Sequence, residues 1–167
     1  MKDIIYQLQE KARQLRIDIV SMLYKSGSGH PGGSLSAADI VSALFFDQMR
    51  LDMADLKNPG QDRFVLSKGP APPVLYAALA RKGYFPVEEL DTLRRFGSRL
   101  QGHPDLKTPG VAVATGSLGN GFPQAVGLAL SQKLDGKGFN TYALLGDGEC
   151  QEGLVWEAAM AAGHFKL

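Results

Sequence analysis

The chain has 167 residues, 18 Lys and Arg against 17 Asp and Glu, a net charge of +1, and a hydrophobic content of 44%. This length and apolar content suit one domain with a real core, and the near-neutral charge gives no sign of a nucleic acid or an anionic membrane as partner. No apolar run approaches the ~18 residues of a membrane span, and a single cysteine excludes an internal disulfide. We therefore expect one soluble, cytoplasmic domain over residues 1–167, without a signal peptide.

The N-terminal stretch predicts an amphipathic helix over residues 3–25. Its apolar residues recur at steps of three and four, as one face of a helix requires. These residues are Ile5, Leu8, Ala12, Leu15, Ile19 and Met22. Gly27 is expected to end the helix, and the Gly- and Pro-rich residues 26–34 are expected to lack regular structure.

A strand and two helices are predicted next. Ser36, with Asp39 three residues later, has the pattern of an N-cap for a helix that runs to about Met49. After a polar, turn-rich segment over residues 51–62, the sequence RFVLS at 63–67 predicts a short strand buried in a parallel sheet. The Pro-Pro pair that follows can open the next helix, because proline is favoured in the first turn.

Two histidines share the rigid frame Gly-His-Pro. His30 stands in the first glycine-rich loop, and His103 stands in a loop over 96–109 that follows a short helix predicted over 86–95. Each histidine alone is either a surface turn residue or a functional one, since loops carry function often. Two histidines in one frame favour function. Three His and one Cys without ligand-type spacing argue against a zinc site.

A second glycine-rich loop, residues 116–121, joins a strand predicted over 111–115 to a helix predicted over 122–134. Such a loop leaves N–H groups free to bind an anion at the helix N-terminus, or it merely allows a tight crossover. The spacing matches neither GxGxxG nor GxxxxGK[ST], so the loop does not indicate a Rossmann or P-loop site.

The segment YALLGDGECQEGLVWE, residues 142–157, predicts a strand, a tight turn and a helix within an α/β unit over 140–164. Ligands of open α/β sheets bind beyond the carboxyl ends of strands, where Asp147 would lie between two glycines. A carboxylate there suits magnesium, which usually binds together with phosphates. By itself, however, Gly-Asp-Gly is more typical of a plain turn. The predicted fold is α/β, with a mostly parallel sheet and helices on both faces.

Four segments resemble, in order and spacing, the N-terminal region of transketolases. They are SGHPGGSLSAADI, GHPDLKTPG, TGSLGNGFPQAVGLAL and LLGDGECQEGLVWEAAMAAGH. The resemblance covers nearly the whole chain and is nearest to stand-alone N-terminal subunits, which pair with a separate C-terminal subunit. The first two segments favour transketolase over the alternative of a related thiamine enzyme, such as a deoxyxylulose-phosphate synthase.

The resemblance implies a thiamine diphosphate-binding module that uses Mg²⁺. It implies that Asp147 holds the metal, that Gly116 and Gly148 contact the diphosphate, and that Leu118 contacts the thiamine rings. The implied reaction, part of carbohydrate metabolism in the pentose phosphate pathway, transfers a two-carbon ketol unit between sugar phosphates.

For substrate and partner, the resemblance implies that His30 and His103 line the substrate channel and assist proton transfer, as imidazoles can near neutral pH. Glu152 and Glu157 are implied at the subunit interface of a dimer or heterotetramer. From the residues alone, Glu152 is also suited to a helix start by the helix dipole. The glutamate that activates the cofactor belongs to the partner subunit in this family.

Two features depart from the family pattern. Pro70 stands where transketolases carry a histidine, and proline offers neither an imidazole nor a backbone N–H. The sequence also reaches Leu167 before the strand whose asparagine completes the family's metal site. We therefore expect an incomplete module with an open sheet edge, inactive as an isolated chain. The alternative from another class is a non-catalytic fragment that acts as a binding or assembly module.

Overall fold

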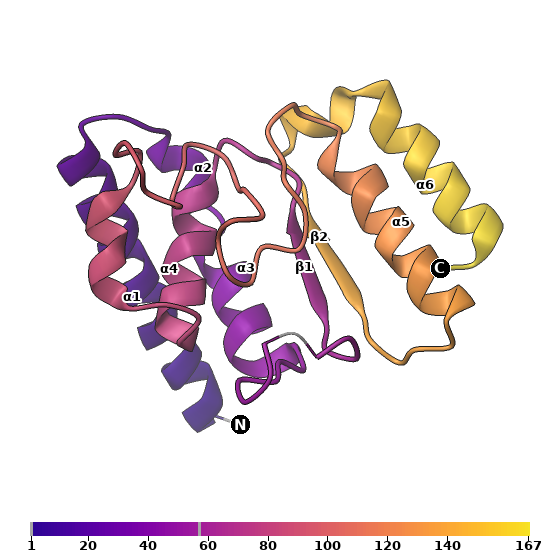
Figure 1. Ribbon diagram of the computed structural model, residues 1–167, viewed down its shortest axis with the longest axis horizontal. Coiled ribbons are helices and arrows are strands. Elements are labelled where there is room, and N and C mark those ends of the chain that lie inside the picture. The colour runs from indigo at the N-terminus through magenta and orange to yellow at the C-terminus, as the bar shows by residue number, and fades with distance from the viewer. Residues whose placement is uncertain (1, 57) are drawn as a thin grey trace.

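The computed structural model describes residues 2–56 and 58–167. Its described residues form one two-stranded parallel sheet, which lies between two groups of helices: α1 to α4 on one side, α5 and α6 on the other (Figure 1). The predicted α/β fold, with a parallel sheet and helices on both faces, is confirmed. No helix in this described part of the chain has both the length and the apolar character needed to cross a membrane.

The elements follow one another as helices, strand, helices, strand and helix. In order they are α1 (Lys2–Ser26), α2 (Pro31–Leu35), α3 (Ala38–Ala43) with a π-helical turn (Leu44–Gln48), β1 (Arg63–Leu66), α4 (Pro72–Lys82), a 3₁₀ turn (Val87–Thr92), α5 (Gly121–Leu134), β2 (Thr141–Leu144), a second 3₁₀ turn (Gly148–Gln151) and α6 (Gly153–Phe165).

Helix α1 follows the predicted apolar periodicity. Ala12, Leu15, Ile19 and Met22 are buried against the core, whereas Ile5, at the N-terminal end of the stripe, is half exposed. Gly27 ends the helix as predicted, with a positive φ of 64° and its N–H donating to the carbonyl of Leu23 at 3.0 Å. The core joins α1, α3 and α4 to the buried strand β1.

Two predictions about the segment after α1 were wrong. Pro31–Leu35 forms a short helix, because Pro31 takes the first turn, where its missing N–H is not needed. Ser36 is not an N-cap. Its hydroxyl donates instead to the carbonyl of Gly33 at 3.3 Å, and α3 begins only at Ala38.

The strand predicted over Val111–Thr115 was also wrong. Thr115 crosses the carboxyl end of β1, where its hydroxyl donates to the carbonyl of Leu66 at 2.8 Å. Its N–H donates to the carbonyl of Pro104 at 3.3 Å, so this backbone bonds to a loop rather than to a strand. The short helix predicted after Pro86 is a 3₁₀ turn. The polar segment 51–62 contains no helix or strand among its described residues, and position 57 lies outside them.

Strands β1 and β2 pair in parallel from Arg63 opposite Thr141 to Leu66 opposite Leu144. Both strands therefore end at the same edge of the sheet. The residues that follow, from Ser67 after β1 and from Gly146 after β2, are brought side by side at that edge. In open α/β sheets this is the edge where ligands bind.

Asp62 connects the amino ends of the two strands. Its carboxylate is fully buried. It accepts hydrogen bonds from the N–H of Asn140 at 2.7 Å, from the N–H of Arg50 at 2.9 Å and from the guanidinium of Arg50 at 3.0 Å. Burial raises the pKa of the Asp62 carboxyl, but these donors lower it more, so that its pKa lies below the usual value.

We expect Asp62→Asn to lower the free energy of unfolding at neutral pH by about 1–3 kcal/mol, because an amide nitrogen then faces buried donors. A carboxyl whose pKa is depressed by folding stabilises the protein above its unfolded pKa of about 3.9. That stabilisation is lost as the pH falls through the folded value. Urea denaturation should therefore show a smaller difference between wild type and variant near pH 3 than near pH 7. An equal difference at both pH values would contradict this role of the Asp62 charge.

Candidate active site

A pocket of about 390 Å³ lies where the carboxyl ends of β1 and β2 meet the loop before α2. Its walls combine glycine backbone, one lysine, one histidine and two acidic residues. The lining residues are His30, Gly32, Gly33, Ser36, Lys68, Pro70, Ala71, Leu118, Gly146, Asp147, Gly148 and Glu149. A smaller cavity of about 160 Å³ lies near Arg63, at the other end of β1, and is lined mainly by core residues.

Four of the predicted site residues line this one pocket, although they come from three distant parts of the sequence. They are His30, Leu118, Asp147 and Gly148. His30 precedes α2 in extended backbone. Asp147 and Gly148 are exposed to solvent in the turn after β2. The fold thus places an imidazole, an apolar side chain, a carboxylate and a glycine backbone around a single space.

His103 and Gly116 lie directly beside this pocket. A Cβ added at Gly116 would stand 3.6 Å from the His103 ring, and a Cβ added at Gly69 would stand 2.6 Å from the backbone nitrogen of Gly116. Gly69 precedes Pro70 in the pocket wall. The exposed His103 therefore neighbours the pocket through two glycine backbones that approach each other closely.

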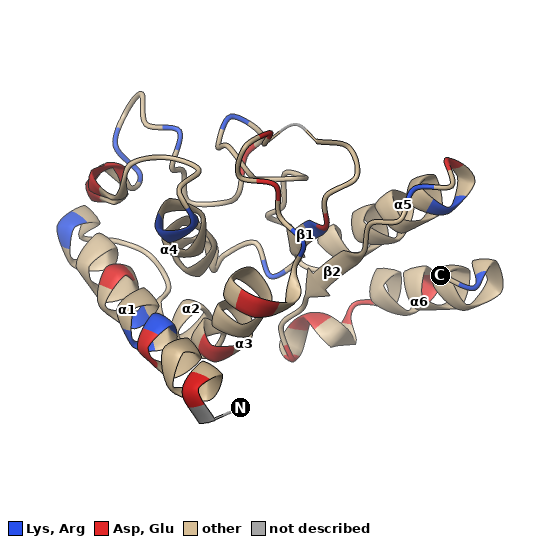
Figure 2. Ribbon diagram, turned by 90° about the horizontal axis from the view of Figure 1, so that it is seen from below, with Lys and Arg blue, Asp and Glu red and all other residues tan. Residues whose placement is uncertain are grey.

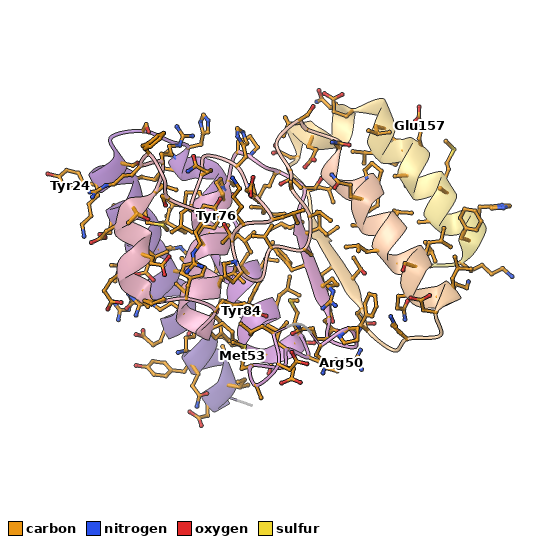
Figure 3. All side chains as sticks on the ribbon, in the orientation of Figure 1. Tyr24, Arg50, Met53, Tyr76, Tyr84 and Glu157 are labelled. Carbon is orange, nitrogen blue, oxygen red and sulfur yellow. The ribbon has the colours of Figure 1, made fainter. Side chains whose placement is uncertain are left out.

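Tyr76 of α4 fixes the loop that carries His103 through hydrogen bonds to the loop backbone. The Tyr76 side chain is buried and points into the molecule (Figure 3). Its hydroxyl can donate its proton to the carbonyl of His103 at 2.9 Å or to that of Gln101 at 3.0 Å. Burial raises the pKa of Tyr76 far above its ordinary value, so the hydroxyl stays protonated as a donor.

Arg94 connects the two histidine loops. Its guanidinium lies against Gly102, where an added Cβ would come within 3.0 Å of it. It also donates to the Ser28 hydroxyl at 3.3 Å. Sequence reasoning missed Arg94 and Tyr76, because neither belongs to the glycine-rich patterns that drew attention to the site.

Lys68 and Glu149 are further pocket residues that sequence reasoning missed. Lys68 is half-buried, with its ammonium 3.5 Å from the Ser36 hydroxyl. Burial lowers the pKa of the Lys68 ammonium, while the charges of Asp147 and Glu149 oppose that effect. Glu149 is buried, although it belongs to the pocket lining. The one sequence signal that could have identified these two residues is their position, because a basic and an acidic residue follow the ends of two predicted strands.

Glu152 and Glu157 do not line the pocket. Glu152 occupies the N-cap position of α6, and its Cβ packs against Gly119 so closely that an added Cβ there would stand 2.8 Å away. Glu157 points away from the body of the molecule (Figure 3). Few charged residues accompany it on α6, whereas charges of both signs are spread over α1 (Figure 2).

Close packing of glycines at the strand ends leads to a prediction with a matched control. A Cβ at Gly121, the first residue of α5, would stand 2.6 Å from the Cα of Ser67, whereas a Cβ at Gly127 in the same helix meets nothing within 4 Å. We expect Gly121→Ala to destabilise the chain by about 1–3 kcal/mol through overpacking. Gly127→Ala should stabilise it by roughly 0.5–1 kcal/mol, because alanine favours helix interiors. Thermal denaturation of both variants checks this, and equal effects would show that the two backbones do not approach as described.

Comparison with known proteins assigns the fold to a family. Residues 6–167 match the family of the transketolase, thiamine diphosphate binding domain. The chain is 48% identical, over 96% of its length and 58% of the relative's, to a 6-deoxy-6-sulfo-D-fructose transketolase subunit of a Clostridium species. It is 44% identical to one subunit of the apulose-4-phosphate transketolase of Phocaeicola vulgatus, over 96% of this chain and 57% of that protein.

Solved structures agree with these sequence matches. Transketolase of Pichia stipitis in complex with sedoheptulose-7-phosphate superposes with a TM-score of 0.89 at 38% identity, over 94% of this chain and 25% of that one. Transketolase of Leishmania mexicana gives a TM-score of 0.88 at 34% identity, over 94% of this chain and 25% of that one. The chain thus spans little more than half the length of the subunit relatives and a quarter of these structures. It belongs to the family of transketolase thiamine diphosphate-binding domains.

Proposed function

We propose that this chain is the cofactor-binding part of a transketolase that transfers a two-carbon ketol unit from a ketose phosphate to an aldose phosphate, using thiamine diphosphate and Mg²⁺. One observation carries the proposal. His30, Leu118, Asp147 and Gly148 meet around one pocket at the carboxyl edge of a parallel sheet, in a chain that belongs to this family.

The residues of the pocket fit the cofactor. Gly32 and Gly148 have open space where a Cβ would stand, so their backbones leave room for a diphosphate to approach. Among the described lining residues, Lys68 supplies the one ammonium group. Leu118, 43% exposed, offers an apolar surface to a ring. When bound, thiamine diphosphate supplies the carbon–carbon bond chemistry, and the protein supplies binding and orientation.

Asp147 is our candidate for the magnesium ligand. Among the described residues, no three His, Cys, Asp or Glu side chains gather to hold a metal ion. Magnesium does not need such a cage, because it is usually held by one or two carboxylates together with phosphate oxygens and water. A single exposed carboxylate beside a diphosphate pocket can therefore supply one of the metal's ligands. Gly116 and Gly148 are assigned to the diphosphate.

His30 and His103 are assigned to the sugar substrate. Both imidazoles are exposed, one in the pocket wall and the other beside it. A neutral imidazole can accept a proton from a sugar hydroxyl, and an imidazolium can return one, near neutral pH. The Tyr76 hydroxyl and the Arg94 guanidinium fix the loops that carry the two rings. These loops therefore hold the proton-transferring groups around one substrate position.

A separate partner subunit completes the proposed enzyme. Both sequence relatives described above are named as subunits. Large apolar side chains of α6 are exposed, as in protein interfaces; they include Leu154, Trp156 and Met160. We place Glu152 and Glu157, from the same helix, at this interface in a dimer or heterotetramer. The proposal includes Mg²⁺, pentose phosphate metabolism and a cytoplasmic location, which the single cysteine suits.

A non-catalytic binding module is the second candidate, and Pro70 is the observation that favours it. Pro70 lines the pocket, and its ring offers no hydrogen-bond donor to a phosphate. Every relative described above is a transketolase, which favours a transketolase over a deoxyxylulose-phosphate synthase. Binding of the cofactor separates the enzyme part from the binding module.

Calorimetry with thiamine diphosphate and Mg²⁺ tests the proposal. We expect the wild-type chain to bind the cofactor only when Mg²⁺ is present. Asp147→Ala should weaken binding at least about 100-fold, because changes one shell further from a metal already cost roughly 10–100-fold. Asp135→Ala, in the exposed turn after α5, is the control and should bind as wild type. Equal affinity of wild type and Asp147→Ala would exclude Asp147 as the ligand, and no binding by the wild type would favour the binding module.

Pro70→His tests the departure from the family pattern. We expect tighter cofactor binding, because a hydrogen bond to a charged group contributes about 1.5–3 kcal/mol, or roughly tenfold to a hundredfold in affinity. We also expect a slightly lower melting temperature of the cofactor-free chain, since losing a proline costs about 0.4–1 kcal/mol of stability. Pro86 is exposed and lies outside the pocket. Pro86→His should therefore lower the melting temperature slightly and leave the affinity for the cofactor unchanged. Unchanged affinity of Pro70→His would mean that position 70 does not contact the cofactor.

A further inference from the structure

Glu149 is a charged residue with only 1% of its surface exposed. It directly follows Asp147 and Gly148, which are both exposed. Burying a carboxylate is unfavourable unless hydrogen bonds replace the water that it loses. Its position therefore calls for a specific set of donors.

The donors come from three separate segments of the pocket wall. The Ser67 hydroxyl, directly after β1, donates to Oε1 at 2.5 Å. The N–H of Gly119, in the second glycine-rich loop, donates to the same oxygen at 2.9 Å. The N–H of Gly146, at the start of the turn after β2, donates to Oε2 at 2.9 Å. One carboxylate thus joins the ends of both strands to the glycine-rich loop.

Each backbone donor lies next to a residue assigned to the cofactor. Gly119 follows Leu118, and Gly146 precedes Asp147. Hydrogen bonds that fix the backbone at Gly119 and Gly146 therefore also fix the positions of the Leu118 side chain and of the Asp147 carboxylate. The glycine-rich loop also needs this restraint, because Gly119 holds a positive φ of 83°, and a glycine reaches such values in many alternative loop conformations.

A role in stabilising the fold does not by itself explain why a glutamate is buried at position 149. None of the ion pairs formed by the described residues includes Glu149, so its charge has no salt-bridge partner in the part of the chain that the structure describes. Its three hydrogen-bond donors are neutral, and the Lys68 ammonium in the same pocket acts on it only through its charge. A buried charge costs free energy that these interactions must first offset. It is, however, well suited to fix geometry, since a carboxylate can accept several hydrogen bonds in defined directions.

We propose that Glu149 is a positioning residue that holds the glycine-rich loop and the turn around Asp147 in their cofactor-binding geometry before the cofactor arrives. This inference rests on the proposed function for its ligand. Affinity for a ligand falls in proportion to the fraction of molecules in the competent conformation. Glu149 keeps that fraction high through its hydrogen bonds to the two segments.

The test compares Glu149→Gln with Glu88→Gln, an exposed control in the 3₁₀ turn after α4. Glutamine keeps one acceptor oxygen but turns its NH₂ toward at least one of the three donors, which then loses its partner. Calorimetry with thiamine diphosphate and saturating Mg²⁺ should give a dissociation constant about tenfold higher for Glu149→Gln, as expected if the competent fraction falls to about a tenth. Glu88→Gln should match the wild type.

Amide hydrogen exchange of the cofactor-free chain provides a second measurement that does not depend on cofactor binding. We expect faster exchange at Gly119 and Gly146 in Glu149→Gln, with Val65 in β1 as protected as in the wild type. Ser67→Ala, which removes one donor and leaves both backbone donors paired, should show the same changes to a smaller degree. If Glu149→Gln does not fold, Ser67→Ala decides alone: unchanged affinity and unchanged exchange at both glycines would overturn the proposal.

The outcomes separate this inference from the proposed function. Wild-type affinity in Glu149→Gln, or a uniform loss of protection that includes Val65, would overturn the positioning role. If the wild type itself does not bind thiamine diphosphate, the proposed function fails. Exchange at Gly119 and Gly146 then still decides whether Glu149 holds the two segments, with selective acceleration supporting that role and no change overturning it.

Discussion

The register of the two parallel strands is the constraint on which the rest of the structure depends. With Leu66 opposite Leu144, both strands end together, and the chain leaves the sheet at two neighbouring points. Lys68 and Asp147 therefore face one space from two strands that are far apart in the sequence. A shift of one residue would turn every side chain of a strand to the opposite face, so the pocket exists only in this register.

Glycine backbones then allow a third and a fourth segment to reach the same space. Gly69 and Gly121 lie so close to Gly116 and Ser67 that no side chain fits between them, and the second glycine-rich loop consequently rests on the end of β1. Glu149 closes the arrangement by accepting hydrogen bonds from both strand ends and from this loop. His30 and His103 belong to loops that are fixed by the polar contacts of Arg94 and Tyr76 rather than by the sheet.

Patterns with a local cause were predictable from the sequence, and contacts between distant residues were not. The stripe that ends at Met22 and the apolar run around Val65 have a local period or composition, and α1 and β1 formed as predicted. Ser36 was misassigned because its hydroxyl bonds to Gly33 instead of capping a helix. Glu149 follows an exposed turn, and in the sequence it therefore resembles a surface residue. Its burial could not be predicted, because its donors Ser67 and Gly119 stand 82 and 30 positions away in the sequence.

The central claim is that this pocket binds thiamine diphosphate with its metal at Asp147. A crystal structure of the chain grown with thiamine diphosphate and Mn²⁺ in place of Mg²⁺ tests it most directly, because the anomalous signal of manganese locates the ion independently of the fit. Our account predicts an anomalous peak within coordination distance of the Asp147 carboxylate, with diphosphate density against Gly116 and Gly148. A cofactor bound elsewhere, or a manganese peak away from Asp147, would contradict it.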